Sequence, residues 1–314
     1  MLLGGLGNMG QSIMEAFGFS GDWQRVTWIS NVINGNNIFN QLVKYAKDLL
    51  TTNPANWKTD AWNFVSGLNA AMVAVGSGLV VFFFLYGFFT SSIDAKNELK
   101  IQNMIKMLIK LVLVNGVVVF NMYIITAIMK SIMAIIEFIP TQLTGTTSDA
   151  LISNSTVIYD DLFVRAIESD SNFFDTILGS IITFLYLIVM AAAGVIILYY
   201  AFTRFLKLYS IIPFGAIALA TLASDNKDIS ITGVSYFKYV IATCLEGGVM
   251  LIAICLFPYI MAAGDSDPFL SVVEGTTATT PLILVFTLKY IILAVLCIGA
   301  VKGAMTLINK AFGI

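Results

Sequence analysis

The chain lacks histidine entirely and is poor in cysteine and in charge: its 314 residues include no His, three Cys and 11% charged residues. Histidine is the commonest general base and metal ligand, so its absence excludes the Ser–His pair of a rhomboid-type protease and the HExxH motif of a zinc protease. Soluble domains carry about 25% charged residues. The cysteines, Cys244, Cys255 and Cys297, all lie in apolar segments, which favours buried thiols over a disulfide framework or redox site.

Other catalytic motifs are also missing from the sequence. The nearest match to the Gly-x-Gly-Asp motif of aspartyl intramembrane proteases is Ala262-Ala-Gly-Asp265, which lacks the first glycine. No glycine-rich phosphate loop of the Walker A type occurs. We therefore predict a protein that is not an enzyme and that has no catalytic, cofactor-binding or metal site.

Long apolar segments without charged residues make up much of the sequence. Residues 68–89 and the 28 residues 176–203 contain no charged side chain, and 58% of the whole chain is hydrophobic. A helix needs about 20 apolar residues to cross roughly 30 Å of hydrocarbon. The sequence therefore predicts a multi-pass membrane protein.

The predicted fold class is all-α, a polytopic bundle of about five transmembrane helices. We place the spans at 68–90, 108–137, 176–203, 239–263 and 281–302. A shorter apolar stretch, 208–223, contains Pro213 and Gly215. It is either a sixth short span or a re-entrant or broken element, which is tolerated at membrane depth only where protein covers its backbone.

Residues 1–65 form a separate N-terminal region, and 66–314 form the transmembrane domain with a large loop at 138–175. A helix from Ile38 to Leu50 in the first region carries apolar residues at helical spacing, with lysines and Asp48 between them, which is typical of a surface or interfacial helix. Asn53-Pro54 ends it. Trp57 and Trp62 follow where an aromatic belt precedes the first span.

Charge distribution predicts the orientation of the spans. If 208–223 does not cross, the basic residues gather on one side: Lys96, Lys100, Lys106, Lys110, Arg204, Lys207, Lys227, Lys238, Lys302 and Lys310. The other side receives the acidic loops 138–175 and 264–280, together with Lys44, Lys47 and Lys58, which Asp48 and Asp60 partly offset. Because Lys and Arg in short loops stay cytoplasmic, we expect the N-terminus outside and the C-terminus inside.

Several charged residues lie near the predicted span ends. Lys106 and Lys110, one turn apart, mark the point where the second span leaves the head-group layer. Lys130 and Glu137 fall toward its other end, where snorkelling to the opposite interface explains them. Arg204 and Lys207, with Tyr209, end the third span as cytoplasmic snorkelling anchors.

Two charged residues fall within predicted spans, Glu246 in the fourth and Lys289 in the last. A charge at mid-membrane costs about 3 kcal/mol or more, so each needs a partner or water. The functional interpretation is an ion-conducting or proton-coupled site. The structural interpretation is a buried Glu246–Lys289 ion pair, or polar groups that line a shared cavity.

Uncharged polar and small residues indicate close helix packing. Asn115 and Asn121 are predicted to form interhelical hydrogen bonds worth about 1 kcal/mol each. Small residues at Gly76 and Gly78, 191–194, 247–248, and Gly299 with Gly303 favour tight bundling or oligomerisation.

One stretch, 199–221, reads YYAFTRFLKLYSIIPFGAIALAT, a basic and aromatic helix end that leads into an apolar segment containing Pro213. Together with the outward N-terminal region, five spans, one large outward loop and inward C-terminus, it resembles the TrbL-type conjugal transfer proteins. These are the polytopic inner-membrane component of type IV secretion systems, the equivalent of the sixth VirB component. The form of the stretch is closest to versions from Gram-positive conjugative elements, and the long hydrophilic C-terminal extension of some relatives is absent.

The resemblance implies a channel or scaffold subunit in the bacterial cytoplasmic membrane that aids translocation of DNA and protein. It further implies a homo-oligomeric ring, for example a pentameric one, that is surrounded by membrane lipids. Other secretion components would be its partners: ATPases, a coupling protein and envelope subunits, with transient contact to transferred DNA or protein. The 138–175 loop is acidic, so transferred DNA is expected to meet the lysine-bearing inward surface first.

The sequence is also compatible with two other functions. A secondary transporter of a small solute or ion would use Glu246 and Lys289 and a helix broken near Pro213, although no internal repeat is found. A membrane scaffold without a conduit is the third possibility.

Overall fold

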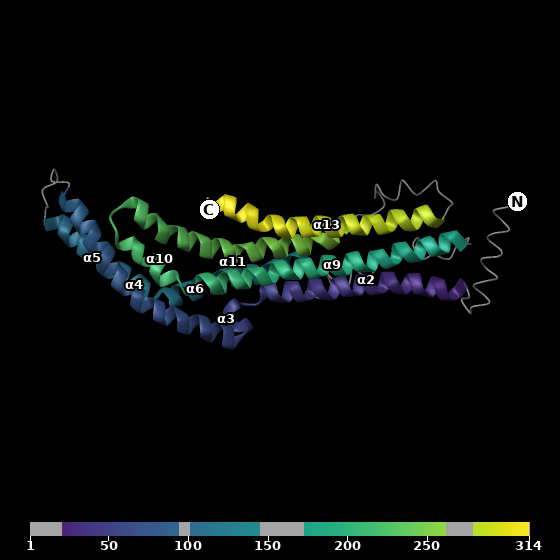
Figure 1. Ribbon diagram of the computed structural model, residues 1–314, viewed down its shortest axis with the longest axis horizontal. Coiled ribbons are helices and arrows are strands. Elements are labelled where there is room, and N and C mark those ends of the chain that lie inside the picture. The colour runs from purple at the N-terminus through teal and green to yellow at the C-terminus, as the bar shows by residue number, and fades with distance from the viewer. Residues whose placement is uncertain (1–20, 94–100, 145–172, 262–278, 314) are drawn as a thin grey trace. The chain divides into compact units, whose positions relative to one another are not determined.

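The computed structural model describes residues 21–93, 101–144, 173–261 and 279–313, and every element in these ranges is helical. The fold class predicted from the sequence is confirmed. The helices, labelled in Figure 1, are α2 (Gly21–Thr51), α3 (Pro54–Trp57), α4 (Thr59–Ile93), α5 (Ile101–Val119), α6 (Asn121–Thr144), α9 (Phe173–Ile211), α10 (Gly215–Ala220), the 3₁₀ helix η1 (Thr221–Ala223), α11 (Lys227–Met261) and α13 (Thr279–Phe312).

Five of these helices are long and apolar enough to cross a membrane, which confirms a membrane-embedded, multi-pass protein. The spanning segments are Thr59–Thr90, Asn121–Ile139, Ser180–Ile211, Lys227–Leu256 and Tyr290–Phe312. The predicted boundaries need adjustment. The first and fourth segments begin earlier than the sequence predicts, and the domain boundary placed at residue 65 lies inside α4.

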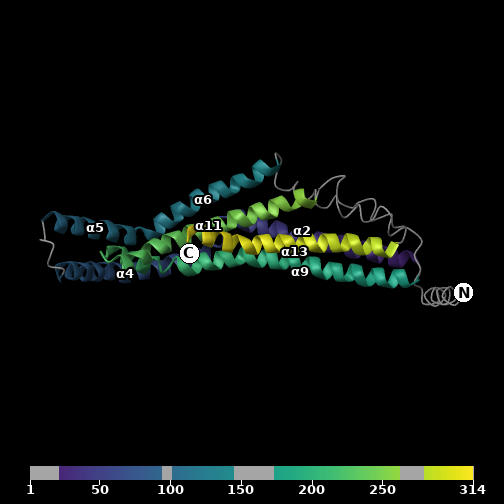
Figure 2. The same ribbon diagram turned by 90° about the horizontal axis from the view of Figure 1, so that it is seen from above.

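The predicted span at 108–137 corresponds to two consecutive helices. The chain forms two helices there, α5 and α6, which meet at Phe120, and the bend between them is visible in Figure 2. The backbone bonds from Phe120 N–H to Gly116 and from Ile124 N–H to Phe120 keep helical spacing, at 2.9 and 3.0 Å. The helix therefore bends without losing these hydrogen bonds, and its part that is long and apolar enough to cross a membrane is Asn121–Ile139.

The chain divides into two compact units, each assembled from separate parts of the sequence. Residues 1–47, 140–200 and 252–302 form unit 1, and residues 48–139, 201–251 and 303–314 form unit 2. Among the described helices, five contribute residues to both units: α2, α6, α9, α11 and α13.

In unit 1, α2 packs along α9. A Cβ added at Gly194 would meet Leu42 Cδ1 at 2.9 Å, and one at Gly35 would meet the backbone of Leu187 at 3.2 Å. The hydroxyl of Tyr186 donates to Asn36 Oδ1 at 2.5 Å. The apolar side of α2 is thus buried by protein, so this helix is not the purely surface or interfacial helix predicted. Lys47 is only 3% exposed.

In unit 2, the stretch 208–223 is a broken continuation of α9. The helix α9 ends at Ile211, because Pro213 has no N–H to donate and disfavours a helical Ile212. Helix α10 then packs against α4 and α5 before the chain turns into α11. A Cβ added at Gly76 of α4 would lie 2.8 Å from the carbonyl oxygen of Ala216, so these two backbones touch. Of the two alternatives that the sequence left open, a sixth short span and a re-entrant or broken element, the structure shows the broken element. Protein covers its backbone.

Large apolar side chains also face outward along the spans. On α4 alone, Phe64, Val75, Phe82 and Phe89 are more than half exposed. Such a surface is unsuited to water and matches hydrocarbon as the surrounding solvent. The three cysteines are buried free thiols, as predicted.

Candidate functional site

Arg204, near the end of α9, caps the C-terminus of α2. Its Nη1 donates to the carbonyl oxygen of Leu50 at 3.1 Å. In a continued helix that carbonyl would bond to the N–H of residue 54, which is a proline and has none. The guanidinium fills this vacancy, and its positive charge suits the negative end of the helix dipole.

The structure corrects the interpretation of Arg204 as a snorkelling anchor. Its side chain has no exposed surface, its Nη2 donates to Met133 Sδ at 3.4 Å, and its Nε has no partner in the described part of the chain. Room for the guanidinium comes from Gly247 of α11, because a Cβ there would overlap it. Arg204 therefore holds α2, α6 and α11 together from inside unit 2.

An aromatic corner supports the same junction. The hydroxyl of Tyr209 donates to the carbonyl oxygen of Pro54 at 2.6 Å. Trp57 packs against Phe202 and Phe205, with ring centroids 5.6 and 5.0 Å away. The predicted belt residue Trp57 thus contacts protein, and the end of α9 fixes the chain between α2 and α4.

The break in α9 has its own polar support. Asn69 of α4, only 3% exposed, donates through Nδ2 to the carbonyl oxygen of Ile212 at 3.2 Å. The same oxygen accepts a bond from the N–H of Gly215 at 3.1 Å. Pro213, which directly follows Ile212 in the sequence, is buried. The carbonyl group that the helix break leaves without a normal helical partner is therefore hydrogen-bonded within unit 2, as the hydrocarbon of a membrane requires.

Lys207 and Glu246 form a buried ion pair. The Lys207 ammonium lies 3.1 Å from both carboxylate oxygens of Glu246, with 18% and 6% of the two side chains exposed. The ammonium also donates to Met305 Sδ at 3.1 Å. Sequence analysis assigned Lys207 to the membrane surface, but it pairs with the buried acid of α11. The side chain of Lys289 lies outside the described residues, so its predicted pairing with Glu246 stays a prediction.

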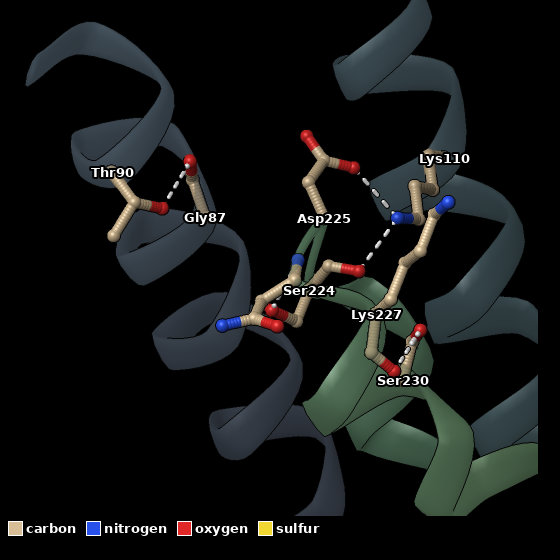
Figure 3. A network of polar contacts seen from close by, with 8 residues as sticks. Gly87, Thr90, Lys110, Ser224, Asp225, Lys227 and Ser230 are labelled. Atoms are coloured by element: carbon tan, nitrogen blue, oxygen red, sulfur yellow. Dashed lines mark hydrogen bonds and ion pairs between the residues drawn. The ribbon is translucent and has the colours of Figure 1, made fainter. Parts of the chain in front are cut away.

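Lys110 also has specific partners. Figure 3 shows it reaching from α5 to the turn before α11, where its Nζ lies 2.7 Å from both Ser224 O and Asp225 Oδ1. Gly87 of α4 stands against the same turn, since a Cβ there would meet Asp225 N at 3.1 Å. Lys106, one turn earlier, is exposed. Lys96 and Lys100 lie outside the described residues.

The two asparagines predicted to join helices do not do so in the described part of the chain. Asn121 is fully buried, and neither its Oδ1 nor its Nδ2 has a hydrogen-bond partner there. Asn115 is exposed. Asn121 lies on the same buried face of α6 as Ile125 and Met129, at helical spacings of four and eight residues.

Taken together, these contacts satisfy backbone carbonyls and pair charges. Among the described residues, no group of three His, Cys, Asp or Glu side chains could hold a metal ion. Comparison with family models, with curated proteins and with solved structures finds no match to this chain.

Sequence reasoning missed Asn69, Gly247 and the Ser224–Asp225 turn as functional partners. Asn69 was detectable as a polar residue inside a run that is otherwise apolar. Gly247 was noted as a small residue, but its role depends on a guanidinium 43 residues away in sequence. No local pattern could have linked the two.

Proposed function

We propose that this protein is an integral membrane channel or scaffold subunit of a conjugative type IV secretion machine. The observation that carries the proposal is the stretch 199–221, whose basic, aromatic and proline-broken pattern resembles that of TrbL-type proteins. In the structure this stretch is the end of α9 and the whole of α10, and its Arg204 and Tyr209 bond to the chain around α3.

The arrangement of polar groups in unit 2 supports a subunit of an assembly. Its buried charges stabilise the bundle itself, while broad apolar faces of α4 and α5 stay exposed. Such faces are available to lipid and to neighbouring subunits in a membrane. We propose a homo-oligomeric ring, for example a pentamer, that works beside ATPases, a coupling protein and envelope subunits and contacts transferred DNA or protein only transiently.

We propose that the subunit lies in the bacterial cytoplasmic membrane with its N-terminus outside and its C-terminus inside. Arg204 and Lys207 no longer support this orientation, because their charges are used inside unit 2. The support that remains comes from lysines outside the candidate spanning segments: Lys96, Lys100, Lys106 and Lys110.

Deletion of the gene from a donor strain tests the proposal. We expect conjugative transfer to fall to the level of a donor that lacks the coupling ATPase, and to return when the gene is supplied in trans. The deletion should leave growth unchanged. Normal transfer from the deletion strain, with its other transfer genes intact, would refute the proposal.

A secondary transporter is the second candidate, because a broken helix near buried charges is typical of transporter sites. In this chain the charges Lys207 and Glu246 neutralise each other, and the break is hydrogen-bonded by Asn69. Solute flux in proteoliposomes that contain only this protein would favour the transporter over the secretion subunit.

A further inference from the structure

Lys130 lies in the middle of a helix segment that is long and apolar enough to cross a membrane. In the candidate segment Asn121–Ile139 it is nine residues from one end and nine from the other. At 1.5 Å of rise per residue, that is about 13 Å of helix on either side, compared with roughly 30 Å of hydrocarbon in a bilayer. A charged side chain at such a position needs a protein partner or water.

The orientation of α6 is fixed by its contacts. One face is buried at Ile125, Met129, Ile132 and Ile136. A Cβ added at Gly248 of α11 would lie 3.3 Å from Ile136 Cγ1, and Met133 contacts Arg204. This face of α6 therefore points into unit 2.

A polar stripe runs along the other side of the helix. Tyr123, Lys130 and Glu137 follow one another at seven-residue intervals, which places them in line on one face. Tyr123 is 77% exposed, and Lys130 and Glu137 are also exposed. Neither charge pairs with another side chain in the described part of the chain.

Beside the stripe, the exposed surface of α6 is largely apolar, and the exposed Ser131 donates its hydroxyl to the carbonyl oxygen of Ala127 in the same helix at 3.0 Å. Ile135 and Phe138 are 63% and 60% exposed and lie to one side of the polar stripe. One flank of the helix thus suits lipid, and the stripe does not. Charged groups within membrane spans face protein or a water-filled cavity, because hydrocarbon solvates neither sign.

We propose that the stripe Tyr123–Lys130–Glu137 faces a water-filled space enclosed by copies of this chain, so that α6 forms part of the conduit wall. The inference rests on the proposed ring. Water is the occupant that satisfies both an ammonium and a carboxylate without a matched partner. The two charges also cancel, so the stripe does not grip a polyanion such as DNA as a run of lysines would. A surface of this kind lets a charged chain pass without holding it.

Cysteine accessibility in the assembled machine tests this assignment. Lys130→Cys and Glu137→Cys are introduced singly into the full-length protein in donor membranes, and their reaction with a charged, membrane-impermeant thiol reagent is timed. Because only a hydrated thiol ionises and reacts, both should react faster than Ile135→Cys by on the order of tenfold or more. Ile135→Cys is the matched control, since it is on the same helix and also exposed but on the apolar flank. The native cysteines are buried and contribute little background.

Two results would overturn the assignment. Equal, slow reaction of all three cysteines would place the stripe in lipid. Protection of Lys130→Cys together with its disulfide cross-linking to a second polypeptide would place a protein helix, not water, against the stripe. The proposed function is tested separately. Fast labelling of the stripe together with normal transfer from the deletion strain would support a hydrated stripe but refute the secretion role. Loss of transfer without labelling would do the reverse.

Discussion

Replacement of Gly247 with alanine lowers the thermal stability of the purified protein strongly, whereas the same change at the adjacent Gly248 has a small effect. The added Cβ at Gly247 overlaps the guanidinium of Arg204, so this fully buried side chain has to shift within the packed interior. At Gly248 the nearest atom is Ile136 Cγ1, 3.3 Å away, in a side chain that yields by a few tenths of an ångström. Overpacking of a dense core costs typically about 1–3 kcal/mol.

Displacement of Arg204 adds to that cost, because the Leu50 carbonyl at the end of α2 loses its donor. Thermal unfolding of the two variants in the same detergent, followed by circular dichroism, measures the difference. Gly78→Ala is a second control, since no atom lies within 4 Å of its added Cβ. Equal melting temperatures for the variants at Gly247 and Gly248 would show that Arg204 does not lie across α11.

Removal of either member of the Lys207–Glu246 pair destabilises the bundle more than removal of both. Lys207→Met leaves a carboxylate that is 6% exposed without a cation, and Glu246→Leu leaves the ammonium beside a thioether alone. Breaking a buried ion pair costs about 3–5 kcal/mol, while replacing both members by apolar residues of similar size is often neutral.

A double-mutant cycle separates this prediction from a general loss of packing. Free energies of unfolding in a mixed-detergent titration are compared for the wild type, each single variant and Lys207→Met/Glu246→Leu. We expect the double variant to recover most of the loss. Additive effects of the two substitutions would mean that the side chains do not interact in the membrane.

Length and composition were enough to predict the fold class. Segments such as 68–89 and 176–203 are too long and too uncharged for anything but a membrane helix, and the structure confirms five of them. The break at Pro213 was also predictable, because proline removes a donor from the helix. These features depend on local chemistry, which the sequence displays directly.

The partners of the charged residues were not predictable in the same way. Arg204 and Lys207 stand at the end of an apolar run, a position where snorkelling is the usual explanation. Only the fold shows that the carbonyl of Leu50 and the carboxylate of Glu246 lie within reach. The bend at Phe120 had no signal either, since neither proline nor glycine occupies that position.

Whether α10 turns into the bundle against α4 is tested most directly by a disulfide between Gly76→Cys and Ala216→Cys. A Cβ at Gly76 would lie 3.1 Å from Ala216 Cβ, shorter than the roughly 3.5–4.5 Å of a disulfide, so the two backbones have to separate by a few tenths of an ångström for the bond to form. With the three native cysteines replaced by serine, mild oxidation of intact membranes should join these two positions within one chain. The pair Gly78→Cys and Ala216→Cys should stay reduced, because the space beside Gly78 is open. If the second pair oxidised as readily as the first, or if neither did, the segment 208–223 would not lie along α4. The contacts described for Arg204, Asn69 and Pro213 in unit 2 would then be contradicted.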